Sequence, residues 1–224
     1  DTIIEIGPGL GTLTQELARA NTKIIAIEKD PMMLDILKET LADYKNIKII
    51  QADARNIGFG NLYLKKYKIV ANLPYNVATF LIRQWLELDA TPPSLKLRRA
   101  RPEKMVLMIQ KEVAQRIVAK PPRMNLLAVS VQFYAGAKIV DYVPAEAFWP
   151  RPKIDSAIIE IVPKENAVFP AIANKTAFFK VVKAGFSQPR KQLIGNLMKK
   201  LPAKGGKITK EKFLEIFKKT NIPE

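Results

Sequence analysis

The chain has 224 residues, of which 48% are hydrophobic and 26% are charged, and its formal net charge at pH 7 is +16. A chain of this length and composition can bury a full hydrophobic core, and no apolar run approaches the roughly 18 residues of a membrane-spanning helix. The absence of both Cys and His excludes disulfides, thiolate and imidazole catalysis and Cys/His zinc sites, so we expect neither a metal nor a membrane span.

The first half of the chain alternates β-branched runs with amphipathic stretches. Strands are predicted at 2–6, 23–27, 48–51, 67–71 and 105–109, and helices at 10–20, 31–44, 76–88 and 111–119. Strands separated by helices of this length pair in parallel through right-handed crossovers. The sequence therefore predicts a doubly wound α/β sheet with helices on both faces.

The second half has a different pattern. A Pro/Arg-rich loop at 91–102 predicts a surface excursion, the apolar run 126–134 fits either a helix or a strand, and late strands at 138–143 and 154–162 are expected to be antiparallel. After Pro163, helices are predicted at 172–185, 189–200 and 209–219. We place a domain boundary near 163–170, which gives an α/β domain over 1–165 and a small helical domain over 166–224.

The positive charge is concentrated in two segments. Residues 1–95 carry 11 Lys or Arg and 11 Asp or Glu, whereas residues 96–123 carry a net charge of +7 and residues 164–224 a net charge of +10. A neutral first half joined to basic segments is typical of a small-molecule domain that also binds a polyanion. The alternative is a hydrated, Lys-rich surface that serves only solubility.

Polar residues and glycines follow the first three predicted strands. Gly7, Gly9 and Gly11 form a turn that lets the backbone approach a ligand, but their spacing differs from the dinucleotide motif, and Pro8 lacks an N–H that a pyrophosphate would need. Glu28 ends the second strand, where a carboxylate can accept from both ribose hydroxyls, and Asp53 follows the third, where it can accept from an adenine amino group. This pattern favours an adenosine ligand without a pyrophosphate, such as S-adenosylmethionine.

These motifs resemble those of a known enzyme class. The runs E-I-G-P-G-L-G at 5–11, I-E-K-D at 27–30, D-A at 53–54 and N-L-P-Y at 72–75 are similar to successive motifs of class I methyltransferases. Three later runs narrow the resemblance to the ribosomal RNA adenine N6-dimethyltransferases: Q-K-E-V at 110–113, F-W-P-R-P-K-I-D-S-A at 148–157 and F-S-Q-P-R-K at 186–191. The resemblance covers residues 1 to about 200 and implies a Rossmann-like methyltransferase sheet followed by a small helical domain.

This sequence differs from the family's pattern at two places. The chain begins with the strand-like Asp1-Thr2-Ile3-Ile4, so we expect that the family's segment before this strand, which also contacts the cofactor, is missing. The loop at 91–102 also looks longer than is usual in the family. Cofactor contacts are predicted for Glu5, Gly7, Gly9, Gly11, Glu28, Lys29, Asp53, Ala54 and Asn72.

The turn N-L-P-Y explains how a methyltransferase could work without His or Cys. The adenine N6 lone pair is delocalised into the ring, so the nitrogen needs both hydrogens held while it becomes tetrahedral. The Asn72 oxygen and a backbone carbonyl in the Asn72-Leu73-Pro74-Tyr75 turn, that of Pro74 by our interpretation, can accept these hydrogens. Tyr75 offers a face for the flipped-out base.

A second aromatic and several basic residues complete the predicted site. The resemblance implies that Phe148 closes the other side of the base, although it could instead anchor its loop in the core, and we expect Trp149 to be such an anchor. Arg190, Lys191, Lys199 and Lys200 are predicted to bind RNA, with packing at the domain junction as the alternative for Arg190 and Lys191.

The predicted function is S-adenosylmethionine-dependent dimethylation of adenosines, two adjacent ones in a hairpin near the 3′ end, in the RNA of an assembling small ribosomal subunit. We expect a cytoplasmic monomer. The alternatives are an antibiotic-resistance methyltransferase of large-subunit RNA, a DNA adenine methyltransferase and a non-catalytic RNA- or transcription-associated scaffold. The Q-K-E-V and F-S-Q-P-R-K runs weigh against the first, the single proline after Asn72 against the second, and the complete set of motifs against the third.

Overall fold

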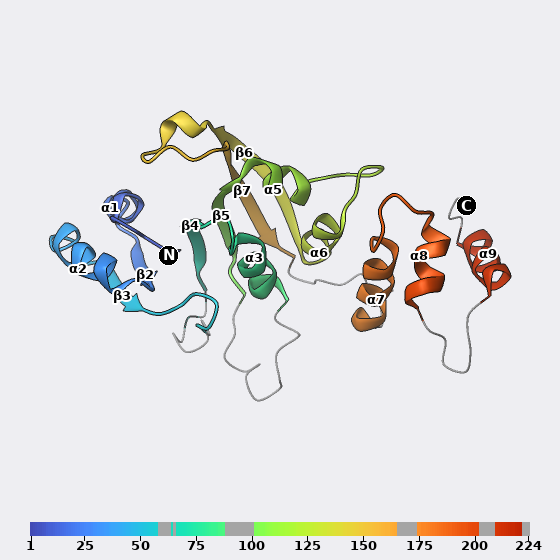
Figure 1. Ribbon diagram of the computed structural model, residues 1–224. Helices are drawn as coiled ribbons and strands as arrows, with labels where there is room; N and C mark the ends of the chain where they lie inside the picture. The colour runs from blue at the N-terminus through green and yellow to red at the C-terminus, as the bar shows by residue number, and fades with distance from the viewer. Residues whose placement is uncertain (58–63, 65, 88–100, 165–173, 202–208, 221–224) are drawn as a thin grey trace.

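The computed structural model describes residues 1–57, 64, 66–87, 101–164, 174–201 and 209–220. Seven strands form one mixed sheet in the order β3-β2-β1-β4-β5-β7-β6 (Figure 1). The strands are β1 (Thr2–Ile6), β2 (Lys23–Glu28), β3 (Ile47–Gln51), β4 (Lys68–Asn72), β5 (Lys104–Gln110), β6 (Ala135–Val143) and β7 (Ser156–Pro163). The helices are α1 (Thr12–Arg19), α2 (Pro31–Thr40), α3 (Ala78–Leu86), α5 (Lys111–Ile117), α6 (Leu126–Tyr134), η3 (Ala145–Ala147), α7 (Lys175–Gly185), α8 (Leu193–Lys200) and α9 (Lys210–Lys219).

The first five strands are parallel, as the alternation of strands and helices predicts. In the middle of the sheet, Ile4 of β1 pairs with Ile25 of β2 on one side and with Ile69 of β4 on the other. The chain therefore builds outward from β1 in both directions, and the order of the strands reverses between β1 and β4. Ligands of open α/β sheets bind at such a switch point, beyond the carboxyl ends of the strands.

The last two strands are antiparallel, which confirms their predicted direction. Met105 of β5 pairs with Ile161 of β7, and β6 continues the sheet beyond β7. The run 126–134, which fits either a helix or a strand by sequence, forms α6, and its C-cap Ala135 already has extended dihedrals. Helix α6 is thus followed by β6 without a loop. The predicted excursion at 91–102 lies almost wholly outside the described residues.

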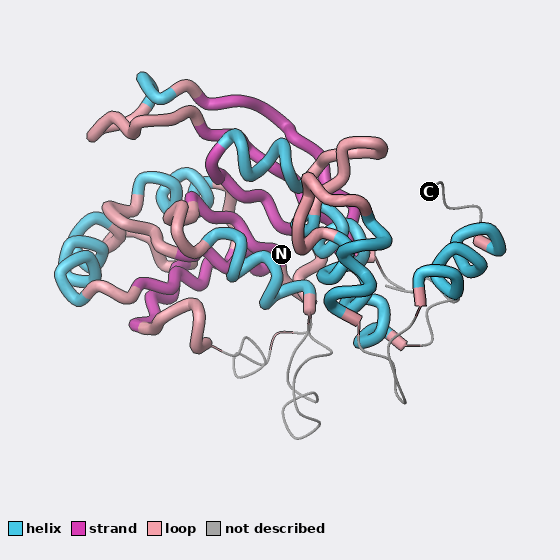
Figure 2. The backbone as a smooth tube through the Cα atoms, turned by 45° about the vertical axis from the view of Figure 1, so that its right-hand side comes forward, coloured by secondary structure: helices cyan, strands magenta, loops and turns pink. Residues whose placement is uncertain are grey.

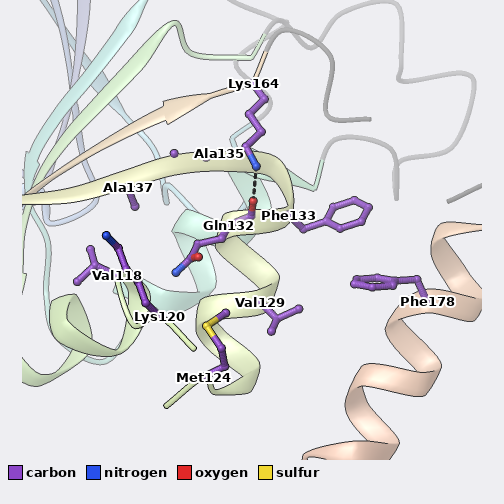
Figure 3. A pocket seen from close by; sticks show the side chains of 11 residues that line it. Val118, Lys120, Met124, Val129, Gln132, Phe133, Ala135, Ala137, Lys164 and Phe178 are labelled. Carbon is purple, nitrogen blue, oxygen red and sulfur yellow. Dashed lines mark hydrogen bonds between the residues drawn. The ribbon is translucent and has the colours of Figure 1, made fainter. Parts of the chain in front are cut away.

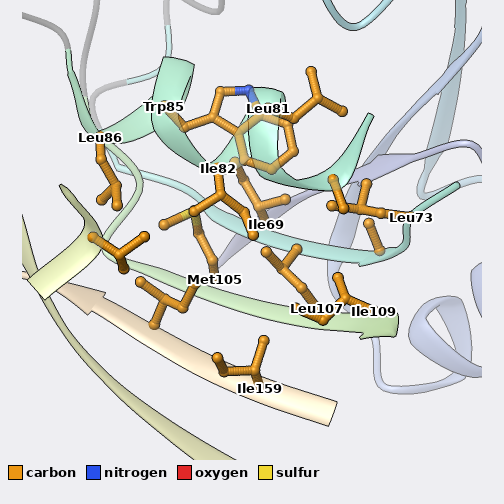
Figure 4. Packing of buried hydrophobic residues seen from close by; sticks show 14 of the residues in the cluster. Ile69, Leu73, Leu81, Ile82, Trp85, Leu86, Met105, Leu107, Ile109 and Ile159 are labelled. Atoms are coloured by element: carbon orange, nitrogen blue, oxygen red, sulfur yellow. The ribbon is translucent and has the colours of Figure 1, made fainter. Parts of the chain in front are cut away.

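Helix α3 covers one face of the central strands. Figure 4 shows Leu81, Ile82 and Trp85 of this helix above Ile69 and Met105 of β4 and β5. All of these side chains are at most 4% exposed, and each fully buried Ile or Leu contributes about 1.5–3 kcal/mol to folding. This packed layer holds β4 in place, and the end of β4 begins the turn N-L-P-Y.

The helices after residue 173 pack in two different ways. Phe178 of α7 stacks on Phe133 of α6 with ring centroids 5.0 Å apart, and Phe179 lies edge-on to Phe133 at 5.1 Å. Helices α8 and α9 instead form a small core of their own with the end of α7, and α9 lies farthest from the sheet (Figures 1 and 2). The boundary predicted near 163–170 falls largely on residues outside the described ranges, and the aromatic contacts join α7 to the sheet domain.

Candidate active site

The turn between β1 and α1 depends on glycines with positive φ. Gly7 and Gly9 have φ of 66° and 57°, and Gly11, the N-cap of α1, has φ of 86°. A β-carbon is strained in this left-handed region. At Gly11 it would also lie 3.1 Å from the Leu37 side chain of α2. The turn is closed by a 2.9 Å hydrogen bond from the Gly11 N–H to the Pro8 carbonyl.

Glu28 stands at the carboxyl end of β2 with one oxygen engaged and one available. Its Oε1 accepts from the backbone N–H groups of Lys29 at 2.7 Å and Asp30 at 2.9 Å. These bonds orient a carboxylate that is only 8% exposed. Within the described residues, no hydrogen bond engages Oε2, so this oxygen can accept from a ligand hydroxyl.

Asp53, just after β3, is held by two cations. The Arg55 Nη2 atom donates to Asp53 Oδ2 at 2.5 Å, Arg55 Nε and N donate to Oδ1 at 3.0 Å, and Lys29 Nζ lies 3.3 Å from Oδ2. The Arg55 side chain and then its backbone N–H hold the pKa of Asp53 well below its usual range. Asp53 is therefore ionised throughout the physiological pH range. A ligand amino group that donates to this carboxylate must share it with Arg55.

These strand ends border a cavity of about 450 Å³, which is large enough for a nucleoside-sized ligand. Five of the predicted cofactor residues line it: Gly7, Glu28, Lys29, Asp53 and Ala54. The other lining residues are Ile6, Ile27, Ala52, Arg55, Pro74, Asn76, Val77 and Leu81. Gly9 and Gly11 shape the turn beside the cavity, and neither belongs to its lining.

Glu5 is the predicted cofactor residue that lies deepest. Its side chain is 1% exposed, and neither its Oε2 nor the nearby Thr14 hydroxyl meets hydrogen-bond geometry with a partner among the described residues. Burial raises the pKa of Glu5 to about 7, and the proximity of Thr14 offsets part of the rise. The structure thus buries this acid in β1 with its Oε2 unpartnered among the described residues, outside the cavity lining.

A second cavity, of about 280 Å³, lies beyond the end of β4. It is lined by Asn72, Leu73, Pro74, Tyr75, Phe148, Pro150 and Pro152. All five residues predicted to act on the acceptor base are therefore brought together, although Phe148 is 73 or more positions away from the others in the sequence. Pro74 lines both cavities, so they are neighbours at this proline.

The backbone of the turn limits what each residue can do. The Leu73 side chain is 1% exposed and belongs to the core, so only its backbone can face a ligand. The Pro74 carbonyl, predicted to accept an adenine hydrogen, already accepts from the Val77 N–H at 3.1 Å and keeps one lone pair. No hydrogen bond to the Leu73 carbonyl occurs within the described residues.

Contacts from the start of β7, two strands away from β4 in the sheet, hold Tyr75 and the loop that carries Phe148. Tyr75 Oη and Ser156 Oγ of β7 are 2.9 Å apart and share a hydrogen bond. Asp155 accepts from Lys111 Nζ at 3.1 Å and from the Ala145 N–H at 3.3 Å. The Lys111 ammonium lowers the pKa of Asp155, so this carboxylate stays ionised and fixes both ends of the loop between β6 and β7.

The two aromatic residues of that loop have opposite environments. Phe148 is half-buried and lines the acceptor cavity. Trp149 is 97% exposed, so the expectation that it anchors the loop in the core is wrong. The expectation failed because hydrophobicity alone does not tell which of two adjacent side chains in an extended segment faces the protein.

The four predicted RNA-binding residues lie on the helical part. Arg190 and Lys191 occupy the loop between α7 and α8, Lys199 and Lys200 end α8, and all four are exposed. Exposure leaves them accessible to phosphates and argues against a packing role for Arg190 and Lys191. The loop itself is held by the buried Asn196, whose Nδ2 donates to the carbonyls of Gly185 and Gln188 at 2.9 Å each.

A third cavity, of about 460 Å³, lies away from the site between α6, the start of β6 and α7 (Figure 3). Apolar side chains such as Val129, Phe133 and Phe178 line it, and Lys164 Nζ at its rim donates to the Gln132 carbonyl at 2.7 Å. It shares no lining residue with the other two cavities.

Sequence reasoning missed three features of the site. Arg55 had a detectable signal, because a cation two residues after Asp53 can fold back onto it, but its occupation of the carboxylate is visible only in the structure. The contacts of Ser156 with Tyr75 and of Lys111 with Asp155 join segments 44 to 81 positions apart and had no local signal.

The described part of the chain contains neither a candidate membrane-spanning helix nor a candidate metal site. Over these ranges, no helix is both long and apolar enough to cross a bilayer. No cluster of three or more acidic side chains that could hold a metal ion occurs there either.

Comparison with known proteins gives the family. A family model described as ribosomal RNA adenine dimethylase matches residues 1–223. A ribosomal RNA small subunit methyltransferase A from Dehalococcoides mccartyi is 40% identical over 199 residues, and the match covers 88% of this chain and 65% of that protein. The chain therefore spans slightly less than two thirds of the length of this relative.

Two solved structures have a similar fold. A dimethyladenosine transferase from Plasmodium falciparum is 25% identical with a TM-score of 0.74, and the match covers 99% of this chain and 82% of that one. The 23S rRNA methyltransferase ErmE is 22% identical with a TM-score of 0.70, over 98% and 91% of the two chains, which shows a common fold. On the evidence of the family match and these likenesses, the chain belongs to the ribosomal RNA adenine dimethylase family.

Proposed function

We propose that the protein transfers methyl groups from S-adenosylmethionine to N6 of adenosines in small-subunit ribosomal RNA. The observation that carries the proposal is that two neighbouring cavities share Pro74 as a lining residue. One cavity collects the groups that suit an adenosine ligand, and the other collects Asn72, Tyr75 and Phe148, which suit a flat base with an exocyclic amino group.

The residues of the cavity of about 450 Å³ at the strand ends fit S-adenosylmethionine. Glu28 has a free Oε2 for a ribose hydroxyl, Asp53 is a permanently ionised acceptor, and the turn at Gly7 brings backbone close without a β-carbon. The cavity lining includes only apolar side chains besides the polar groups at the strand ends and Asn76, which suits the flat face of an adenine. When bound, the cofactor supplies a methyl group on a sulfonium, an electrophile that needs no further activation.

In the acceptor cavity, the protein's task is to position and polarise the amino nitrogen. Asn72 Oδ1 accepts one N6 hydrogen, and a carbonyl of the turn accepts the other. Pro74 has one lone pair left for this role, and the Leu73 carbonyl is free of hydrogen bonds within the described residues, so the turn offers two carbonyl acceptors. Neither contact removes a proton before the methyl group is transferred, and the proton that the cationic nitrogen then loses passes to water, so no strong base is needed in a chain that has no His and no Cys. The acceptors are fixed before the reaction and stabilise the charge that develops on the nitrogen.

The choice of RNA rests on the relatives and on charge. The Dehalococcoides mccartyi relative carries the name of a small-subunit RNA methyltransferase, and residues 164–224 of this chain carry a net charge of +10. Structured RNA is bound largely through phosphates and shape. We extend the proposal to two adjacent adenosines in a hairpin of an assembling subunit, to a monomer, and to the cytoplasm as the place where such subunits form.

Transfer of tritiated methyl from S-adenosylmethionine tests the proposal directly. Small subunits purified without the modification should be labelled, and nucleoside analysis should return N6,N6-dimethyladenosine. Labelling of large subunits or of DNA instead would support the other methyltransferase classes. No labelling of any substrate by a protein that binds the cofactor and RNA would support a non-catalytic scaffold and would overturn the proposal.

A further inference from the structure

Trp149 has no structural role that its surroundings explain. It is 97% exposed, whereas the other tryptophan, Trp85, is 4% exposed in the core. A tryptophan has one of the largest apolar surfaces of any side chain, and full exposure leaves all of it in water. The ring therefore adds no packing to the fold and is available to a ligand.

Its position is set by an alternation along the loop. Phe148, Pro150 and Pro152 line the acceptor cavity, and the residues between them do not. Phe148 has the extended dihedrals φ −113° and ψ 147°, which direct adjacent side chains to opposite sides. Trp149 therefore lies one residue from the cavity and faces outward from its rim.

Exposed cations lie within four residues of Trp149 in the same loop. Arg151 and Lys153 are both exposed. Arg151 forms an ion pair with Glu146 of η3, which leaves Lys153 as the cation of this loop outside the described ion pairs. An aromatic face beside cations is the combination that binds single-stranded nucleic acid, with bases on the ring and phosphates near the charges.

The loop is held in place at its base. Asp155 is bound by Lys111 Nζ and by the Ala145 N–H, and its own carbonyl accepts from the Lys111 N–H at 3.1 Å. These bonds fix the backbone of the loop at its base, so less backbone ordering entropy opposes binding, while the Trp149 ring itself stays in water.

We propose that Trp149 stacks on the nucleobase next to the target adenosine and thereby positions the RNA strand over the acceptor cavity. The inference rests on the proposed function. A base that enters the cavity leaves its neighbour without a stacking partner, and Trp149 supplies a replacement at the rim. It is a positioning residue, because Phe148 and Tyr75 contact the target base and Trp149 faces away from it.

Fluorescence tests the contact without any turnover. In Trp85→Phe, Trp149 is the only tryptophan, and the emission of the wild type minus that of Trp149→Phe isolates the same signal if Trp85→Phe does not fold. A hairpin RNA with adenosines in its loop should quench this emission. The same hairpin with an abasic site in place of the nucleotides flanking the target adenosine should bind with much less quenching. Equal quenching by both hairpins, or none by either at saturating RNA, would overturn the proposal.

Kinetics separate positioning from catalysis. Trp149→Ala should raise KM for the RNA about 10-fold, a middle value for the loss of one base–aromatic stack, with kcat within 2-fold of the wild type. Trp149→Phe should restore most of the loss because it keeps a ring. Phe80→Ala, which removes an exposed aromatic of α3 that lines neither site cavity, should leave both constants unchanged.

The outcomes distinguish this inference from the proposed function. A wild-type protein that methylates no ribosomal RNA contradicts the proposed function, and the fluorescence comparison then still decides whether Trp149 stacks on a base. A wild-type protein that is active, together with Trp149→Ala at an unchanged KM and an unquenched Trp149, contradicts the inference alone.

Discussion

The crevice at the carboxyl ends of the parallel strands and the helical segment after residue 173 differ in how far their polar side chains are exposed to water. At the crevice, Glu28 lines the cavity of about 450 Å³ and is 8% exposed, and Glu5 of β1, outside that lining, is 1% exposed. On the helical segment, Arg190, Lys191, Lys199 and Lys200 are all exposed to solvent. The first region removes a few groups from water and holds them at set positions, whereas the second leaves many charges hydrated.

This difference matches two kinds of recognition. A reaction at one nitrogen depends on acceptors whose positions are fixed before the ligand binds, and the desolvation of these groups costs stability. A grip on a polyanion depends on summed charge, which hydrated and mobile side chains supply at little cost. We therefore expect large effects from single substitutions in the crevice and small effects per residue on the helices.

The largest expected effect is at Asn72. Asn72→Ala removes a pre-positioned acceptor and should reduce the rate of methyl transfer by roughly 10²–10³-fold, with nearly unchanged cofactor affinity. Single-turnover rates with labelled cofactor measure the first quantity and calorimetry the second. Gln115→Ala, at an exposed amide on α5, is the control and should leave both unchanged. Near-normal transfer by Asn72→Ala would remove the basis for treating the acceptor cavity as catalytic.

Replacing the buried Glu5 tests how much its burial lowers the free energy of unfolding as pH rises. Its pKa of about 7 lies above the unfolded value of 4.5, so between these pH values the folded state binds more protons than the unfolded state, and stability falls as pH rises. Above pH 7 the loss is complete, with an upper limit of about 3 kcal/mol. Glu5→Gln, which cannot ionise, should gain up to this amount over the wild type between pH 4.5 and pH 8.

Urea unfolding at the two pH values measures this gain. Glu39→Gln, an exposed carboxylate on α2, should show little change with pH and serves as the control. A gain from Glu5→Gln that is the same at both pH values would mean that Glu5 is not protonated in the folded protein near neutrality.

Glu28 should have an intermediate effect on cofactor affinity. Charge-assisted hydrogen bonds contribute about 1.5–3 kcal/mol each, so Glu28→Ala should weaken binding of S-adenosylmethionine by at least about 10-fold. Glu28→Gln keeps one oxygen for the N–H groups of Lys29 and Asp30 and separates the loss of the free carboxylate oxygen from loss of the turn. Calorimetry with unchanged affinity for both variants would show that Glu28 does not hold the ribose.

The smallest effect per residue is expected on the helical segment. Reversal of Arg190, Lys191, Lys199 and Lys200 to Glu should weaken binding of the small subunit and flatten the slope of log affinity against log salt by roughly 0.7–0.9 for each phosphate that the variant no longer neutralises. Cofactor affinity should hardly change, because none of the four lines the cavity of about 450 Å³ at the strand ends. A folded quadruple variant with the wild-type slope would place the RNA grip elsewhere, with residues 96–123 as the next candidate.

Local sequence was sufficient for the parts of the molecule that are built from neighbouring residues. The succession of parallel strands and helices along the chain, the glycine turn and the polar residues at the strand ends follow from βα units, in which side-chain period and turn residues are set within a few positions. The order of the strands within the sheet is visible only in the structure. The limits of helices were less accurate. Helix α2 ends at Thr40 instead of Tyr44, because Leu41 closes the last turn and the chain then bends toward β3.

Only the tertiary structure decided how side chains from distant segments share the site. Phe148 reaches the N-L-P-Y turn because β7 lies next to β5, and Asp155 and Ser156 fix the loop there through Lys111 and Tyr75. Whether Phe148 or Trp149 then faces the cavity depends on the dihedral angles with which the loop enters it, and residue type cannot determine those. The sequence by itself thus determined which chemical groups stand at the strand ends, while the packing of the sheet determined which side chains are buried, which are paired and which remain in water.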